Sequence, residues 1–205
     1  MSRVPTSEYP ARVRLFRQGS HPECAYFIVS GLVKLACLNP EGKEVIVGLR
    51  GPGTLLGAAA VVLSQPYLTT GATLTSCRLA RVSASEFGRL LEGNSSLSQY
   101  VHELHAREVH AHLELLVDAV SRPAQYRLGK LLYDVLFALK PSLRSATDPN
   151  LWLPLRQWEI AELLSVTPEH TNRLLRRLED NGLIRRKGRL LSIPDPNRLL
   201  AVLDA

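Results

Sequence analysis

Two kinds of hydrophobic pattern divide this chain. Between residues 12 and 82, short apolar runs are separated by turns that contain Gly, Pro or Asn, and this pattern predicts β-strands. These runs occupy residues 25–29, 32–38, 44–49 and 73–82. Ser83 then opens a short predicted helix. The first part of the chain is therefore expected to be all-β up to residue 82.

A longer helix is predicted for residues 96–120, which contain neither Gly nor Pro. Apolar residues recur there at spacings of three and four, as they do along one face of a helix. They are Leu97, Val101, Leu104, Val109, Leu113, Leu116 and Val120. A helix of about 25 residues spans about 37 Å, which is more than a small domain needs. We therefore expect a dimer interface along it, with a core helix of the N-terminal domain as the alternative.

The segment 155–193 follows a further predicted helix at 124–139, and its pattern predicts a helix, a tight turn and a second helix. The apolar face of the first helix consists of Trp158, Ile160, Ala161, Leu163 and Leu164. Ser165-Val166 breaks the pattern. Thr167 suits the N-cap of the second helix, and Pro168 suits its first position, because the N–H that Pro lacks has no partner there.

The second helix is expected to bury one side and to end at Asn181-Gly182, since Gly tolerates a positive φ. The buried side consists of Thr171, Leu174, Leu175 and Leu178. Two short apolar runs then flank the basic segment 185–189, which predicts a hairpin, or wing, that turns at Gly188. A short helix from residue 195 is expected to close the chain.

The second helix and the wing carry a local excess of positive charge. Seven Arg or Lys side chains lie between Arg173 and Arg189, against the two acids Glu179 and Asp180. The net charge of the whole chain is only +6, so the clustering carries the argument. Two adjacent basic elements of this kind indicate double-stranded DNA as the partner, with one helix in the major groove. A helical hairpin whose basic face is merely solvated is the alternative.

Several other classes of protein lack support in the sequence. There is no P-loop, GxSxG, HExxH or dinucleotide-binding fingerprint, so we expect no enzyme. Cys24, Cys37 and Cys77 are odd in number and far apart, which is typical of reduced thiols in a cytoplasmic protein. The N-terminus has no signal-peptide pattern, and the uncharged stretch 51–77 is too broken by Gly and Pro to span a membrane.

In this order of elements, the chain resembles the cyclic-AMP receptor protein and FNR (CRP/FNR) family of bacterial transcription regulators. Residues 16–57, FRQGSHPECAYFIVSGLVKLACLNPEGKEVIVGLRGPGTLLG, are similar to the β-roll of that family. Residues 159–184, EIAELLSVTPEHTNRLLRRLEDNGLI, are similar to its helix-turn-helix. The resemblance implies an α+β fold in three parts. They are a cyclic-nucleotide-binding-like β-roll (residues 1–94), a dimerisation helix (95–121) and a winged helix-turn-helix (122–205).

The resemblance further implies a homodimer that binds a palindromic DNA site. Bound there, the dimer is expected to recruit or block RNA polymerase. In the family, the positions that match Glu169 and Arg173 read base edges. Glu can accept from cytosine N4, Arg can donate two bonds to guanine, and a spacing of four lets Glu169 orient Arg173. A surface ion pair is the alternative for these two residues.

Two positions depart from the family pattern. Family members often have Arg where this chain has Pro168, so the usual guanine contact is missing and the family's best-known operator is not expected. Arg156 stands where Ser or Thr often caps the first helix. We therefore expect the phosphate contacts to come from Arg156, Gln157, Thr167, His170, Arg176, Lys187 and Arg189. Such contacts position a protein on DNA without specifying a sequence.

The resemblance also allows an effector to be considered. Cyclic-nucleotide-binding members supply a Glu for the ribose and an Arg for the phosphate, and here those positions match Ala58 and Leu68 or Thr69. The positions that read adenine match His112 and Leu113. Because a buried phosphate needs a charge partner, we expect no cyclic AMP and no other cofactor. An iron–sulfur cluster is not expected either, because residues 1–23 contain no cysteine.

Three readings of the effector domain stay open. A regulator without a small ligand is preferred, and a sensor of the same fold that needs an unidentified effector is the alternative. His105, Glu108 and His112 share one helix face and could sense a metal or a proton, although a plain polar stripe is the simpler interpretation and we assign no metal site. A further alternative is an adaptor whose helix-turn-helix binds protein.

Overall fold

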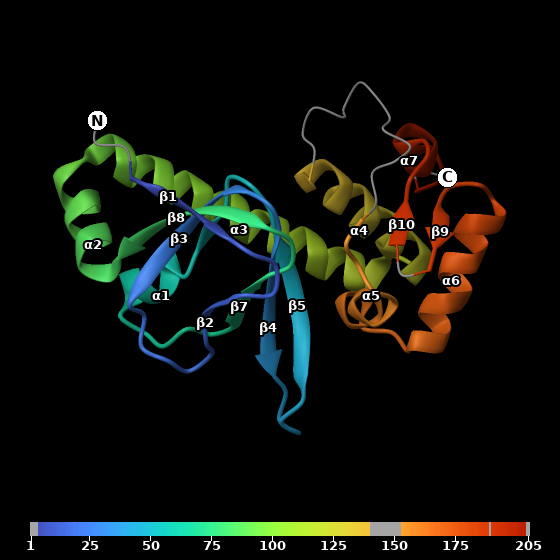
Figure 1. The fold of residues 1–205 in the computed structure, drawn as a ribbon, viewed down its shortest axis with the longest axis horizontal. Coiled ribbons are helices and arrows are strands. Elements are labelled where there is room, and N and C mark those ends of the chain that lie inside the picture. Colours follow the sequence, from blue (N-terminus) through green and yellow to red (C-terminus); the bar gives the residue numbers. More distant parts are fainter. Residues whose placement is uncertain (1–3, 140–152, 189, 204–205) are drawn as a thin grey trace. The chain divides into compact units, whose positions relative to one another are not determined.

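The computed structural model describes residues 4–139, 153–188 and 190–203, and Figure 1 shows their arrangement into helices and strands. The chain forms two compact units, residues 1–115 and residues 116–205, so the division falls within the long helix α3 (Ser95–Ser121). None of the helices in the described ranges combines the length and the apolar composition that a membrane crossing requires.

The N-terminal unit is a sandwich of two antiparallel four-stranded sheets. One sheet has the order β1-β8-β3-β6 and the other the order β2-β7-β4-β5. The strands of the first are β1 (Thr6–Tyr9), β8 (Cys77–Ser83), β3 (Cys24–Ser30) and β6 (Leu55–Leu56). Those of the second are β2 (Arg14–Phe16), β7 (Thr70–Thr73), β4 (Val33–Leu38) and β5 (Glu44–Arg50). The predicted runs are therefore present as β3, β4, β5 and β8, whereas β7 begins before the run 73–82. The strands β1, β2 and β6 and the helix α1 (Ala58–Leu63) lie outside the predicted runs.

The core of the sandwich contains alternate residues of its strands, because successive side chains in a strand point to opposite faces. Its buried members are Phe16, Cys24, Tyr26, Ile28, Val33, Leu56, Tyr67, Cys77 and Leu79. Phe16 stacks on Tyr67 with ring centroids 4.5 Å apart. Two of the three cysteines are thus core residues, and all three are free thiols.

One tight turn shows why the spaced glycines are needed. Gly31 connects β3 to β4 with φ +90°, and a Cβ atom at this position would overlap the carbonyl oxygen of Ser76. Neither the backbone conformation nor the space admits a larger residue. Gly31 therefore fixes the close approach of this turn to the chain before β8.

The outer face of β3 is covered by helices. The helix α2 (Ala84–Gly93) begins at Ser83, whose hydroxyl accepts from the backbone N–H of Glu86, as the sequence predicts. Ala25, Ala58, Phe87 and Val101 form a second buried cluster there, and Leu97 packs against it. Val101 is only 5% exposed, so the first two apolar residues of the long helix are covered by their own chain.

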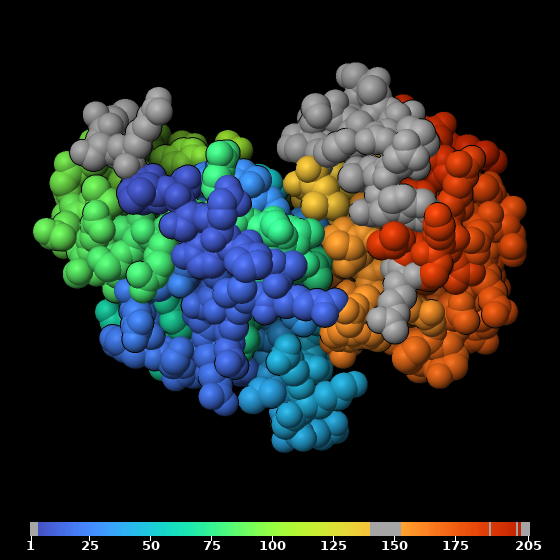
Figure 2. Space-filling view, in the orientation of Figure 1, coloured from blue at the N-terminus to red at the C-terminus, as the bar shows by residue number. Residues whose placement is uncertain are grey.

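Within the described residues, the C-terminal unit contains the end of α3, four helices and a two-stranded hairpin. The helices are α4 (Ala124–Leu139), α5 (Gln157–Leu164), α6 (Pro168–Asp180) and α7 (Pro196–Leu203). The hairpin consists of β9 (Arg185–Lys187) and β10 (Leu190–Ser192), and Leu153 adds a bridge to Leu191. In the space-filling view of Figure 2, the elements from α5 to α7 form one continuous orange to red body. Helix, turn, helix and wing are all present as the sequence predicts.

Candidate nucleic-acid interface

The turn between α5 and α6 is held by backbone hydrogen bonds and by α4. Ser165 adopts the left-handed conformation with φ 54°, and the next N–H, that of Val166, donates to the carbonyl of Ala161 over 3.0 Å. Arg127 of α4 donates from Nη1 to the carbonyl oxygen of Leu164 over 2.9 Å. A cation thus satisfies one of the carbonyls at the end of α5, where cations are favoured.

The start of α5 is held by a buried acid. Glu159 accepts from the backbone N–H of Arg156 through Oε2 at 2.8 Å, and only 5% of the residue is exposed. This contact is the half of a capping box that the third helical residue supplies, whereas the Arg side chain has no acceptor to replace the hydroxyl of a Ser or Thr at the N-cap. The half-buried Arg156 side chain stands at the N-terminal end of α5.

The start of α6 has the predicted cap. Thr167 is the N-cap, and its Oγ1 accepts from the backbone N–H of His170 over 3.2 Å. Pro168 occupies the first turn, where a missing N–H has no cost. Gln157 of α5 donates from Nε2 to the carbonyl oxygen of Pro168 over 3.0 Å. Polar side chains at the starts of the two helices therefore hold the N-terminus of α6 in place.

The helix α6 has a buried apolar face and, opposite to it, an exposed face that carries cations. Thr171, Leu174, Leu175 and Leu178 are all at most 3% exposed, and the helix packs on α4 and α5 through them. The three residues expected to meet bases, Pro168, Glu169 and Arg173, are all exposed. Within the described residues no ion pair joins Glu169 to Arg173, so the orienting contact that their spacing allows is not formed in this structure.

The residues expected to meet phosphates come from three elements of the same unit. Arg156 and Gln157 lie at the start of α5, Thr167, His170 and Arg176 on or before α6, and Lys187 at the end of β9. All six are exposed or half-buried, and Arg189 lies outside the described residues. Their placement on adjacent elements is compatible with a common binding surface, and their contacts with DNA stay a prediction.

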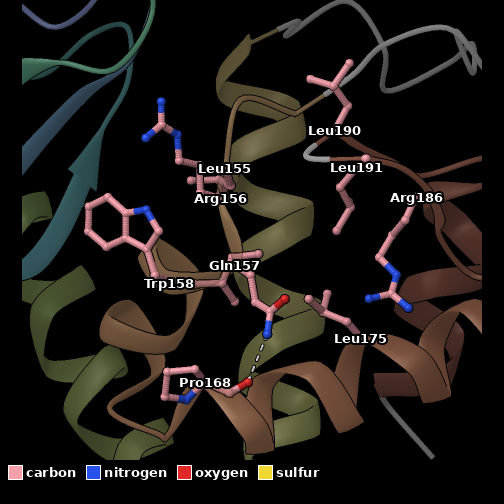
Figure 3. A pocket seen from close by; sticks show the side chains of 11 residues that line it. Leu155, Arg156, Gln157, Trp158, Pro168, Leu175, Arg186, Leu190 and Leu191 are labelled. Atoms are coloured by element: carbon pink, nitrogen blue, oxygen red, sulfur yellow. Dashed lines mark hydrogen bonds between the residues drawn. The ribbon is translucent and has the colours of Figure 1, made fainter.

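A pocket of about 430 Å³ lies between the start of α5, the middle of α6 and the wing. Figure 3 shows Arg156 and Trp158 on one side of it and Leu190, Leu191 and Arg186 on the other, with the Gln157 to Pro168 hydrogen bond below. The wing and the two helices of the motif thus enclose a hollow that is lined by apolar and guanidinium groups. Trp158 is 42% exposed although the apolar pattern predicted an inward side chain, because it is the second residue of α5 and lies at the rim.

One arginine of the wing faces the protein. Arg186 donates to Glu179 of α6 from Nε over 2.7 Å and from Nη2 over 2.5 Å, and its backbone N–H donates to the same carboxylate. Its Nη1 donates to Oδ1 of Asn172 over 3.3 Å. These bonds lower the pKa of the Glu179 carboxyl, so the ion pair is intact at neutral pH and is lost only as the pH falls through that lowered pKa.

This contact was missed in the sequence, where Arg186 was counted with the six other cations of the basic cluster. The signal was nevertheless present. Because side chains alternate along a strand, Arg186 must point to the opposite face from Arg185 and Lys187. The structure has Arg185 and Lys187 exposed and the side chain of Arg186 only 25% exposed.

In the N-terminal unit, the side chain of Tyr67 anchors the segment 51–77 to strand β3. The hydroxyl of Tyr67 donates to the carbonyl oxygen of Cys24 and accepts from its backbone N–H. Burial raises the pKa of Tyr67. Ala58 is 1% exposed, whereas Leu68, next to the anchored tyrosine, is 84% exposed. The position where the family resemblance would have a ribose ligand thus holds a buried methyl group, and the two candidates for the phosphate position are the exposed Leu68 and the half-buried Thr69, neither of which is charged.

The candidate sensor face of the long helix is tied to strand β5. Arg50 donates from Nε to Glu108 over 3.0 Å, and its Nη2 lies 2.5 Å from Nε2 of His112. The Nδ1 of His112 lies 2.8 Å from the carbonyl oxygen of Glu108. His105 takes no part in these contacts. Across the part of the chain that the structure describes, no group of three His, Cys, Asp or Glu side chains could hold a metal ion.

The later half of the apolar stripe on α3 stays uncovered. Val109, Leu113, Leu116 and Val120 are between 56% and 90% exposed, and Leu104 is half-buried. The neighbouring Leu115 and Val117 are exposed as well. Large apolar side chains gathered in this way on exposed turns of one helix are typical of a surface that contacts a partner.

A β-sandwich, a long helix and a helix-turn-helix with a basic wing define a transcription regulator that binds DNA through its C-terminal unit. Known families agree with this class. Residues 6–94 match the cyclic nucleotide-binding domain, and residues 126–202 match the Crp-like helix-turn-helix domain. The chain therefore belongs to the CRP/FNR family, whose members are transcription regulators.

Individual relatives cover nearly the whole chain. The cAMP-activated global transcriptional regulator CRP of Salmonella typhimurium is 24% identical over 187 residues, which is 91% of this chain and 88% of that protein. A CRP-like cAMP-activated regulator of Mycobacterium tuberculosis is 23% identical over 94% of this chain and 85% of its own length. Among solved structures, a CRP-family regulator from Thermus thermophilus has a TM-score of 0.79 at 16% identity, with 97% of each chain covered. FixK2 from Bradyrhizobium japonicum has a TM-score of 0.77 at 20% identity, over 98% of this chain and 97% of its own.

The cap of α6 gives a first test. Thr167→Ala removes the acceptor for the N–H of His170 and is expected to lower the free energy of unfolding of the C-terminal unit by about 1 kcal/mol. Thr167→Ser keeps the acceptor and serves as the matched control. Hydrogen exchange of the His170 amide, measured together with urea unfolding, reports both effects. An alanine variant whose His170 amide stays as protected as in the serine variant would show that the cap does not hold this turn.

Proposed function

We propose that the protein is a homodimeric regulator that reads a palindromic DNA site with α6 and needs no cyclic AMP to do so. The observation that carries the proposal is the division of α6 into a buried leucine face and an exposed face with Glu169 and Arg173. The basic strand β9 follows this helix directly. In such a regulator, bound DNA positions the protein so that it recruits or blocks RNA polymerase.

In this proposal, the base contacts come from the first turns of α6. Arg173 donates two hydrogen bonds to a guanine, and Glu169 accepts from a cytosine, contacts that discriminate by about 1–3 kcal/mol each. Pro168 contributes only apolar contact, because it has no side-chain donor. The preferred site therefore differs from that of family members that have Arg at this position.

The dimer of the proposal is formed by the exposed stripe of α3. Two such helices, packed side by side, would remove Val109, Leu113, Leu116 and Val120 from water. Burying one fully exposed side chain of this size contributes about 1.5–3 kcal/mol, so four from each chain contribute a free energy of the same order as the cost of association. Reading both halves of a palindromic site would require the two copies of α6 to lie about 34 Å apart, one turn of DNA.

The absence of cyclic AMP from the proposal rests on charge. The segment 51–77 has no ionised side chain, and a phosphate that is buried without one loses more solvation than neutral donors restore. Arg50 and Arg78 border this segment. Arg50 already binds Glu108 and lies against His112, one of the two positions that would meet adenine, and Arg78 is an exposed residue of β8. Arg50 is therefore already paired within the protein.

A second candidate is a sensor of the same fold whose DNA binding needs an effector. Its support is the match of residues 6–94 to the cyclic nucleotide-binding domain, together with relatives described as cAMP-activated. A related structure from Xanthomonas campestris is described as a c-di-GMP responsive regulator, with a TM-score of 0.66 at 22% identity over 93% of this chain and 94% of its own. An effector of this protein would be apolar or uncharged, since the exposed residues at and after the end of α1 include Val62, Leu63 and Leu68 and none of them is charged.

Two single substitutions test DNA reading. Arg173→Ala is expected to abolish preference among sites, a loss of about 1–3 kcal/mol of discrimination, while some non-specific binding stays. Lys187→Ala is expected to weaken binding to every sequence alike, because it removes only a phosphate contact. Fluorescence anisotropy with a selected duplex and its single-base variants measures both. Equal loss on all sequences for Arg173→Ala, or a changed base preference for Lys187→Ala, contradicts these roles.

Charged substitutions on the exposed apolar stripe of α3 test whether this stripe forms the dimer interface. Leu113→Glu combined with Val120→Glu is expected to give monomers, since two carboxylates would have to be desolvated in the interface. Leu63→Glu, an equally exposed apolar position on α1, is the matched control and should leave the assembly unchanged. Sedimentation velocity gives the mass. Dimers that persist in the double variant would place the contact elsewhere.

The effector is tested by selection of duplexes from a random pool with purified protein and no ligand. The protein is expected to select a two-fold symmetric sequence, with affinity unchanged by millimolar cyclic AMP. Enrichment only when cyclic AMP is present would overturn the ligand-free proposal and favour the second candidate. Failure to enrich any sequence, together with binding that does not depend on salt, would instead favour an adaptor.

A further inference from the structure

The wing arginine that faces the protein has a role that the binding surface alone does not explain. Arg186 is one of the seven cations between Arg173 and Arg189 that suggested DNA binding. Three of its donor nitrogens, including the backbone N–H, bond to the carboxylate of Glu179, and Nη1 bonds to the amide oxygen of Asn172. A guanidinium has five N–H donors, so most of its directional capacity is already used within the protein.

We propose that Arg186 is a positioning residue for base recognition, which holds the wing against α6 and orients Asn172, and that it does not contact phosphate. This inference rests on the proposed DNA-reading function. Its geometric basis is the carboxylate of Glu179, which accepts from the backbone and the side chain of the same residue of β9. The hairpin is thereby fixed to the helix at one point (Figure 1 shows β9 beside α6).

The contact to Asn172 determines what this side chain can offer to DNA. Asn172 lies one residue before Arg173 and three after Glu169, so it borders the base-reading face of α6. An asparagine that recognises adenine needs both its oxygen and its nitrogen for the two-bond contact. The bond from Arg186 engages one of the two lone pairs of Oδ1 and fixes the orientation of the amide, so that its NH₂ group can act as a donor toward an acceptor on the DNA.

Electrostatics separates Arg186 from its neighbour in the same strand. The Glu179 carboxylate neutralises Arg186 at neutral pH, whereas Lys187 is exposed and belongs to no ion pair among the residues that the structure describes. Because each phosphate contact contributes about 0.9 to the slope of log affinity against log salt, only Lys187 should contribute to that slope. A dimer would double the effect, to about 1.8.

The experiment compares Arg186→Gln with Lys187→Gln as a matched control, in the full-length protein. Affinities are measured between about 50 and 200 mM salt, a range over which such slopes are steep, for the selected duplex and its single-base variants. Arg186→Gln is expected to leave the salt slope unchanged while it alters the ratio of affinities among the base variants by about fivefold or more. Lys187→Gln is expected to do the opposite.

Two further variants keep the test independent of folding. Arg186→Lys retains the charge but loses the planar fork, so it should change base preference as Arg186→Gln does; full rescue by Lys would favour a phosphate contact and overturn the proposal. Asn172→Ala should shift preference in the same direction, and the double variant with Arg186→Gln should change it by less than the sum of the two single effects, because the two residues share one contact. Additive effects would overturn the coupling.

The outcomes separate this inference from the proposed function. Should the wild-type protein bind no duplex in a salt-dependent manner, the DNA-reading function itself fails. Should the wild type bind and Arg186→Gln lower the slope as Lys187→Gln does, only the positioning role fails, and Arg186 is a phosphate contact. A slope that stays constant while base preference changes supports both.

Discussion

The burial of one side of α6 is the constraint on which the rest of the DNA-binding unit depends. Leu174, Leu175 and Leu178 are each at most 3% exposed, and burying each contributes about 1.5–3 kcal/mol. The Thr167 cap contributes about 1 kcal/mol, so packing outweighs capping. Once the leucines face α4 and α5, the helical period leaves Glu169 and Arg173 no position except the outer surface. Exposure of the reading face is therefore a consequence of the core.

The supporting contacts refine this arrangement, and none of them creates it. Arg127 caps the end of α5, Gln157 holds the carbonyl of Pro168, and Glu179 binds Arg186 of the wing. The first two contacts join helices that the leucine core has already brought together, and the third joins the wing to α6. Because a partly exposed ion pair or hydrogen bond contributes little to stability, the value of these contacts lies in fixing orientation. A reading helix needs this, since a bidentate contact with a base tolerates little displacement.

Much of this architecture could be predicted from the sequence. The strand and helix periods indicated the sandwich, the long helix and both helices of the motif, and Thr167-Pro168 and Asn181-Gly182 located the ends of α6. The helix α1 was missed because Ala58–Leu63 is short, uncharged and flanked by Pro and Gly, so no amphipathic period distinguishes it. Val101 and Leu113 belong to one stripe, yet one packs on Phe87 and the other is exposed. Periodicity identifies a face of a helix but not what covers it.

The candidate site was harder to predict than the fold, because charge alone does not tell which cations are neutralised. Arg186 and Lys187 are neighbours with the same sign, and only the alternation of β9 separates the one that faces Glu179 from the one that faces solvent. The same holds for Arg50, which the sequence leaves unassigned and which binds Glu108 on α3. Once the pair of Arg186 with Glu179 is removed from the count of available cations in the C-terminal unit, the positive charge that remains is concentrated on the exposed side of α6 and on the outer face of β9. A footprint of this kind suits the major groove, where one helix reads bases and the adjoining wing holds the backbone.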